Sequence, residues 1–195
     1  HFPSLEDAVK TAQEIIQYGI PIARIEMLNK DQMDISIKYS KLKNVEVLPT
    51  LFFEFHGSEQ SNKEAIKIVE ELSKNNGGSD FKWADTIEKR NELWKARHEV
   101  YYSVKAQVKN GRVYSTDVCV PISKLVECIN FAEIETKNMG LKSPMVGHVG
   151  DGNFHVLFAY DPNIKGEYEK IRKFSDKLIK KTLELDGTIT GEHGI

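Results

Sequence analysis

The sequence predicts an α+β fold, with mainly antiparallel sheets and helices packed on one face. Helix and strand signals alternate along all 195 residues, but the strands are short and include a hairpin over residues 144–160. Neither a G-x-G-x-x-G turn after a strand nor a phosphate-binding P-loop is present. The order of elements therefore differs from that of a regular Rossmann unit.

The first helix has the clearest signals. Ser4 is placed to cap its N-terminus, and Gly19 and Pro21 end it. Its apolar residues recur on one face: Leu5, Ala8, Val9, Ala12, Ile15 and Ile16. A strand over 22–28 and a helix over 30–40 are expected to follow.

Alternating apolar residues predict the next strand around 51–55. Ser61 and Glu64 form a capping box, which predicts the start of a helix that ends near Asn76. A short strand is expected over 81–84.

The second half continues the alternation. In order, it predicts a helix over 86–107, a strand over 113–120, a helix over 122–140, the hairpin, a helix ending at Gly187, and a loop or strand stub over 188–195. The halves 1–85 and 86–195 contain similar sets of elements, so we expect two subdomains.

Composition excludes some partners. The chain has 27 basic and 29 acidic side chains and a net charge of −2, which gives no electrostatic footprint for nucleic acid or an anionic membrane. No apolar run approaches the ~20 residues of a transmembrane helix. Cys119 and Cys128 are expected to be free thiols in a reducing compartment. Because the chain begins at His1 and stops at Ile195, just after a motif, we expect it to be a fragment of a longer protein.

The most informative stretch is residues 147–155, which carry two histidines around a glycine-rich turn. Asp151-Gly152 is a typical two-residue hairpin turn. Centred there, the hairpin would place His148 directly opposite His155 on one face. Two such imidazoles can reach one metal ion at ~2.0–2.1 Å. The alternative is a surface histidine pair, or one packed and one exposed histidine.

A second stretch, residues 187–195, adds two polar side chains among glycines. Glu192 could supply a third, carboxylate ligand, and a site with two histidines and one carboxylate keeps a position open for substrate. His193 is free to act as a base. The alternative for His193 is a loop histidine without a function.

Two further polar residues are candidates. Trp94, Arg97 and Tyr101 fall on one stripe of the predicted helix, where the Arg97 guanidinium could clamp a carboxylate. Alternatively, its stem packs on Trp94 while its head meets a surface glutamate. Asp117 could orient a ligand histidine, or could serve only as a local hydrogen-bond acceptor.

Several of these segments together resemble the C-terminal, cap-side part of the FAD-linked oxidases of the vanillyl-alcohol-oxidase type. The resemblance covers nearly the whole chain. It rests on VGHVGDGNFH, GTITGEHGI, LWKARHEVYYSVKA and YSTDVCVPISKL, supported by ARIEMLN, YSKL and PTLFFEFHGS.

The resemblance implies a ferredoxin-like, duplicated fold, with the metal and substrate site in the second subdomain. His148, His155 and Glu192 would bind a divalent metal, zinc or manganese. His193 would take the proton of the substrate's 2-hydroxyl group, and Arg97 would hold its carboxylate. The residues expected near the cofactor are Asn153, Glu192 and His193, and Asn153 would also position the substrate.

The implied activity is oxidation of a D-2-hydroxy acid, with D-lactate converted to pyruvate, hydride transferred to FAD, and electrons passed to cytochrome c in the mitochondrion. The FAD-binding domain would precede His1, so this chain alone should be inactive. Ser115 stands where relatives acting on D-2-hydroxyglutarate place a lysine, which favours a small monocarboxylate. The alternatives are a D-2-hydroxyglutarate or glycolate dehydrogenase of the same family, a metal-dependent hydrolase, and a non-catalytic metal-binding fragment.

Overall fold

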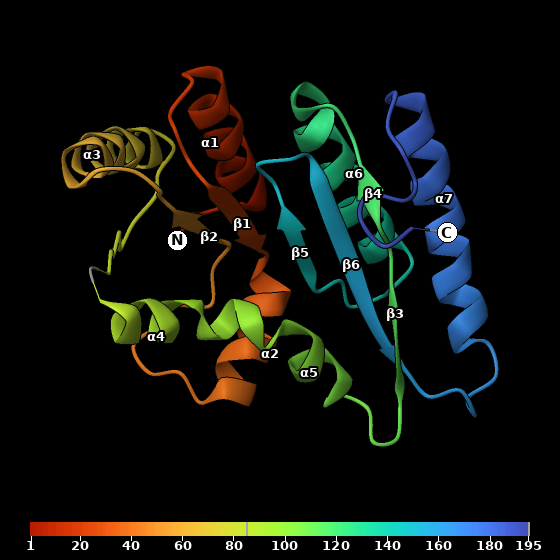
Figure 1. Ribbon diagram of the computed structural model, residues 1–195. Coiled ribbons are helices and arrows are strands. Elements are labelled where there is room, and N and C mark those ends of the chain that lie inside the picture. The colour runs from red at the N-terminus through yellow and green to blue at the C-terminus, as the bar shows by residue number, and fades with distance from the viewer. Residues whose placement is uncertain (85, 195) are drawn as a thin grey trace.

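Figure 1 shows the computed structural model, which describes residues 1–84 and 86–194. The helices are α1 (Leu5–Gln17), α2 (Lys30–Ser40), α3 (Glu59–Asn75), α4 (Ile87–His98), α5 (Val100–Lys105), α6 (Leu125–Asn138) and α7 (Glu167–Glu184), with a short 3-10 helix η1 (Ile122–Lys124). The strands are β1 (Arg24–Leu28), β2 (Thr50–Glu54), β3 (Arg112–Ser115), β4 (Val118–Cys119), β5 (Met145–His148) and β6 (Asn153–Tyr160).

The described strands form one antiparallel sheet in the order β2-β1-β5-β6-β3, and β4 also pairs with β6. The predicted α+β class with an antiparallel sheet is confirmed. Strands from both halves of the chain meet where β1 pairs with β5, Leu28 opposite Val146. The division into subdomains 1–85 and 86–195 stays a prediction, and residue 85 at its boundary lies outside the described residues.

One face of the sheet packs against the larger helical layer, formed by α1, α3, α6 and α7. This face is made by alternate strand residues, including Ile25, Met27, Met145, Phe154, Val156 and Phe158, and they join the apolar stripes of the helices in one buried core. Ser4 caps α1 as predicted, because its side chain accepts a hydrogen bond from the Asp7 N–H.

The opposite face carries a smaller layer of α2, α4 and α5, which lie together at the lower end of the sheet in Figure 1. Here Leu28, Val146 and Leu157 contact a second apolar cluster that includes Met33 and Val104. The sequence predicted helices on one face only. The structure has the larger layer on that face and this smaller layer on the opposite face. Among the polar strand residues of this second face, Glu26, His148, Asn153 and His155 lie outside both clusters and belong to the site described below.

Two predicted helix boundaries differ from the structure. The capping residue of α3 is Ser58, whose hydroxyl accepts from the Ser61 N–H at 3.2 Å, so the predicted Ser61–Glu64 capping box is wrong. The helix predicted over 86–107 is broken at Glu99, whose carboxylate accepts a hydrogen bond from the Ser40 hydroxyl of α2. The break leaves Trp94 buried and Tyr101 half exposed, so they do not share a stripe.

Two strand predictions also need correction. Residues 81–84 form no strand. The strand predicted over 113–120 is interrupted at Thr116 and Asp117, where a side-chain hydroxyl takes the place of a backbone carbonyl in the hydrogen bonds between the strands. The Thr116 hydroxyl accepts the hydrogen bond of the Val156 N–H at 2.9 Å. The carbonyl oxygen of Thr116 is therefore free for another donor.

None of the helices in the described ranges has the length and apolar composition needed to cross a membrane.

Candidate metal and substrate site

The hairpin predicted over 144–160 is present, but its register differs from the prediction. His148 lies opposite Asn153, and His155 lies opposite Val146. The connection is a four-residue turn in which the Asp151 N–H donates to the His148 carbonyl at 2.9 Å. The expected two-residue turn does not form, and Val149, the first turn residue, is fully buried in the core.

The change of register does not separate the two histidines. A shift of two residues keeps every side chain on its face of the sheet. The imidazoles of His148 and His155 therefore share one face, with ring centroids 6.1 Å apart and planes at 87°. The expected same-face arrangement is present, but as a diagonal pair.

His148 is oriented by a residue that sequence reasoning missed. Its Nδ1 lies 2.6 Å from Oε1 of Glu26 in β1, and the Glu26 side chain is only 1% exposed. Burial acts to raise the pKa of Glu26, but the hydrogen bond from His148 and the charge of Arg97 lower it overall. The ionised carboxylate can only accept, so Nδ1 of His148 carries the proton. The hydrogen bond to Glu26 in turn raises the pKa of His148.

His155 is oriented by the backbone. Its Nδ1 lies 2.9 Å from the Thr116 carbonyl oxygen, which can only accept, so Nδ1 donates. The other nitrogen, Nε2, is buried and has no hydrogen-bond partner among the described residues. Burial lowers the pKa of His155, which favours a neutral ring with a free lone pair on Nε2.

Glu192, in the loop after α7, faces both of these rings. Its Oε1 lies 2.9 Å from His155 Nε2, and its Oε2 lies 3.4 Å from His148 Nε2. In a tetrahedral site with bonds of ~2.1 Å, neighbouring donor atoms lie ~3.4 Å apart. A buried lone pair facing a carboxylate is unfavourable unless a cation lies between them. The donors of His148, His155 and Glu192, which all lie within 4.8 Å of one another, fit a metal ion.

Asp117 holds the loop that carries Glu192. Its Oδ2 accepts from the backbone N–H groups of Glu192 and His193, at 2.9 and 2.8 Å. Burial acts to raise the pKa of Asp117, but these bonds lower it overall. Its Oδ1 is 3.6 Å from His155 Nδ1, which donates to Thr116 instead. Of the two interpretations of Asp117, orienting a ligand histidine or serving as a local hydrogen-bond acceptor, its shortest contacts favour the second, since they are with the loop N–H groups and the Asn153 amide.

Asn153 and Gly191 complete this support. The Asn153 side chain donates to Asp117 Oδ1 at 2.9 Å and to the Val118 carbonyl at 3.1 Å, while its buried Oδ1 has no partner among the described residues. A β-carbon on Gly191 would collide with the Asn153 amide and lie 2.7 Å from Asp117 Oδ1. Close approach of the loop to the sheet therefore requires glycine at this position.

Arg97 reaches the same site from α4. Its Nε donates to Glu26 Oε2 at 2.9 Å, and its Nη2 lies 3.5 Å from His148 Nε2. The glutamate that it meets is thus buried, rather than the surface residue of the alternative interpretation. The structure brings the expected carboxylate clamp next to an expected metal ligand.

His193 lies on the outer side of His155. The two rings stack with centroids 4.9 Å apart and planes at 8°. Nε2 of His193 is 3.4 Å from Glu192 Oε1, and its side chain is 54% exposed. Unlike the buried His155, this imidazole can exchange a proton with solvent or with a ligand in the site.

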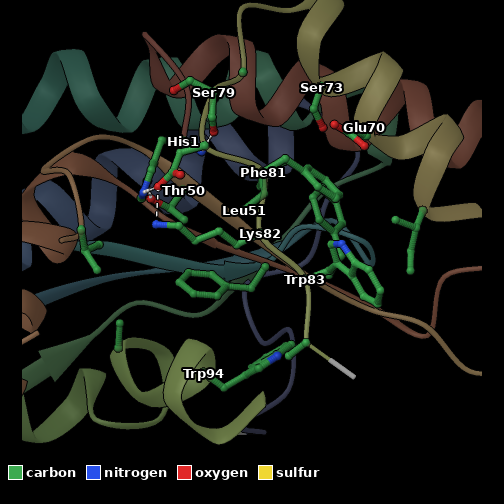
Figure 2. A pocket seen from close by; sticks show the side chains of 18 of the residues that line it. His1, Thr50, Leu51, Glu70, Ser73, Ser79, Phe81, Lys82, Trp83 and Trp94 are labelled. Carbon is green, nitrogen blue, oxygen red and sulfur yellow. Dashed lines mark hydrogen bonds and ion pairs between the residues drawn. The ribbon is translucent and has the colours of Figure 1, made fainter. Parts of the chain in front are cut away.

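A separate cavity lies beyond the edge strand β2. It measures about 720 Å³. Figure 2 shows Phe81 and Trp83 on one side of it and Trp94 on the other, with the ion pair and hydrogen bonds of His1 and Lys82 at one end. The residues of the candidate metal site do not line it, so this cavity and the convergent polar groups are separate features.

Comparison with known proteins identifies the family. The family of FAD linked oxidases, C-terminal domain, matches residues 1–195. The chain belongs to this family, as the resemblance predicted.

Within the family, the chain is similar to D-lactate dehydrogenases. It is 45% identical over 194 residues to the "Probable D-lactate dehydrogenase, mitochondrial" of Danio rerio, covering 100% of this chain and 39% of that protein. It is 35% identical to the "D-lactate dehydrogenase [cytochrome], mitochondrial" of Arabidopsis thaliana, covering 100% of this chain and 34% of that protein. The chain thus spans less than two fifths of the length of these relatives.

A solved structure of alkyldihydroxyacetonephosphate synthase superposes with a TM-score of 0.67, over 96% of this chain and 38% of that one. The sequence identity is 14%, so this match supports the fold alone.

Proposed function

We propose that this chain is the cap part of a flavin-dependent D-2-hydroxy-acid dehydrogenase that oxidises D-lactate to pyruvate. Membership in the FAD-linked oxidase family supports this reaction class over a metal-dependent hydrolase. The names of the Danio rerio and Arabidopsis thaliana relatives support D-lactate as the substrate, a mitochondrial location and, for the second, a cytochrome as the electron acceptor, which we propose to be cytochrome c.

The metal is zinc or manganese, held by His148, His155 and Glu192. The observation that carries this proposal is the buried Nε2 of His155, which faces a carboxylate without a hydrogen-bond partner in the described chain. A divalent cation bound there would polarise the substrate's 2-hydroxyl oxygen and lower the pKa of its proton.

The chain's own residues bind and orient the substrate. Arg97 uses Nε for Glu26, which leaves its Nη groups to donate to the substrate carboxylate. His193, exposed beside Glu192, takes the hydroxyl proton. The flavin supplies the hydride acceptor, since no protein side chain can take a hydride. The unpaired Oδ1 of Asn153 accepts a hydrogen bond from the substrate or the cofactor.

Ser115 supports a small monocarboxylate as the substrate. It lies opposite Leu157 in the sheet, on the face that carries the site, and its hydroxyl donates to the Thr116 carbonyl at 3.0 Å. A neutral side chain at this position offers no charge partner for a second carboxylate.

The test is spectroscopic and uses the protein at its native length. We expect a yellow protein whose flavin absorbance bleaches on adding D-lactate but not L-lactate. Removal of the metal with a chelator should abolish bleaching, and adding back zinc or manganese should restore it. A colourless protein, or equal bleaching by both enantiomers, would contradict the proposal.

A further inference from the structure

Glu26 is a charged residue in the interior of a strand that is otherwise largely apolar and buried. Its two carboxylate oxygens have different partners. Oε1 accepts from His148 Nδ1 at 2.6 Å, and Oε2 accepts from Arg97 Nε at 2.9 Å. One buried carboxylate therefore contacts both a proposed metal ligand and the proposed substrate clamp.

The contact with His148 decides which ring nitrogen is available. A neutral imidazole has one N–H and one lone pair, and only the lone pair can bind a metal. Because Nδ1 keeps its proton to donate to Glu26, the lone pair lies on Nε2, the nitrogen that faces Glu192. If the Nε2–H tautomer formed instead, a proton would occupy the position of the cation.

The contact with Arg97 fixes the guanidinium relative to the same point. Glu26 binds it side-on through Nε, and Nη2 then lies 3.5 Å from His148 Nε2. Since the guanidinium is planar and rigid, its Nη groups are held beside the donors of His148 and Glu192.

We propose that Glu26 is a positioning residue that fixes the tautomer of His148 and the orientation of Arg97 through one carboxylate. The role of His148 as a metal ligand and of Arg97 as a clamp rests on the proposed function. The tautomer that Glu26 imposes is independent of any metal.

The substitution Glu26→Gln tests this arrangement with little change in volume. His148 and Arg97 contact different carboxylate oxygens of Glu26. An amide carries an acceptor oxygen on one side and a donor nitrogen on the other, so it cannot accept from both partners in these positions. Glu54→Gln is the matched control. Glu54 lies on the adjacent strand and the same face, and its ion-pair partners are Arg24 and His56.

The first measurement is the tautomer, read from the ¹⁵N shifts of labelled histidines in the native-length protein stripped of metal. At about pH 9, above the ordinary imidazole range, His148 should carry its proton on Nδ1 in the wild type and in Glu54→Gln. In Glu26→Gln, the Nε2–H form should appear. A wild-type His148 protonated on Nε2 would overturn the inference, and this reading does not depend on the folding of any variant.

The second measurement is Zn²⁺ affinity of the same three proteins. Glu26→Gln should bind roughly 10–100-fold more weakly, the typical effect of losing such an orienting carboxylate, while Glu54→Gln should match the wild type. Equal affinity in all three would overturn the inference but leave the metal site standing. If the wild type binds no zinc or manganese, the proposed metal site fails, while the tautomer measurement still decides the role of Glu26.

Discussion

The rings of His193 and His155 stack almost in parallel, with centroids 4.9 Å apart. His155 is buried and donates through Nδ1 to a backbone carbonyl, whereas His193 is exposed and has no comparably short side-chain contact among the described residues. Two neighbouring imidazoles therefore have different environments, one suited to ligation and the other to proton transfer.

The substitution His193→Gln should separate these two roles. Loss of a general base typically lowers turnover by roughly 10²–10⁴-fold, and we expect a reduction of kcat in that range. Metal content should remain at the wild-type level because the proposed ligands are untouched. Stopped-flow measurement of flavin reduction and elemental analysis test both parts. Wild-type kcat in this variant would contradict the proposed role.

Removal of a proposed ligand should lower the metal content as well as the activity. His155→Ala takes away the buried Nε2 that faces Glu192, so the purified protein should contain little zinc or manganese and show almost no activity. His56→Ala is the control, since His56 is exposed at the edge strand and pairs only with Glu54 in the described chain. Stoichiometric metal in His155→Ala would exclude this ligand set.

Arg97 should act on substrate binding rather than on the metal. Arg97→Lys keeps the charge. It loses the Nε donor to Glu26 and the pair of Nη groups that could bind a carboxylate in a bidentate manner. A hydrogen bond to a charged group is worth about 1.5–3 kcal/mol, so KM for D-lactate should rise by roughly 10–100-fold. Arg24→Lys serves as the control because Arg24 is over half exposed and 3.9 Å from Glu26. Steady-state kinetics that give the same KM for wild type and Arg97→Lys would refute the clamp.

Gly191 should not tolerate a side chain. A β-carbon there would collide with Asn153 and approach Asp117, so Gly191→Ala should displace the loop and weaken metal binding. Overpacking of this kind costs about 1–3 kcal/mol. Gly150→Ala, in the hairpin turn, meets its neighbours at an ordinary 3.6 Å and should behave like the wild type. Calorimetric Zn²⁺ titration and thermal unfolding provide the comparison, and equal behaviour of the two variants would argue against a closely packed loop.

The two cysteines should differ in reactivity. Both thiols are free. Burial raises the pKa of Cys128 to about 11, and it also raises the pKa of the more accessible Cys119. The thiolate is the reactive form, so alkylation of Cys128 should stay slow until the pH nears 11 or the protein unfolds. Mass spectrometry after iodoacetamide treatment at neutral pH should find the adduct on Cys119 first. Rapid labelling of Cys128 in the folded protein would disprove its burial.

The stabilisation of the folded state by Cys128 has a defined pH dependence. Because its folded pKa is raised, the neutral thiol favours the folded state fully below the unfolded value of ~8.5. This contribution is lost as the pH rises toward 11.

Local patterns predicted most of the fold. The helix capped by Ser4 and the alternating strand around 51–55 depend on nearby residues, and both are present. At the break, Glu99 accepts a hydrogen bond from Ser40, which lies far away in the sequence and on another helix. Such a contact leaves no periodic signal in the sequence.

The same distinction holds for the site. The two hairpin histidines fall on one face in the predicted register and in the observed one, because side chains alternate with a period of two. Glu26 was missed because its partners, Arg97 and His148, lie 71 and 122 residues away. A glutamate inside the run Arg24–Leu28, which is otherwise largely apolar, was the available signal. The Thr116 carbonyl that accepts from His155 had no such signal, since its position results from a strand interruption.

The pairing of β1 with β5 joins distant parts of the chain, and this has a consequence for biosynthesis. Glu26 leaves the ribosome long before His148, and Glu192 follows later still. No nascent chain that stops short of Glu192 can therefore present all the groups proposed to orient and bind a cation. Metal loading must follow synthesis of this last loop, and a premature stop before it would yield a polypeptide with an almost complete sheet and no complete ligand set.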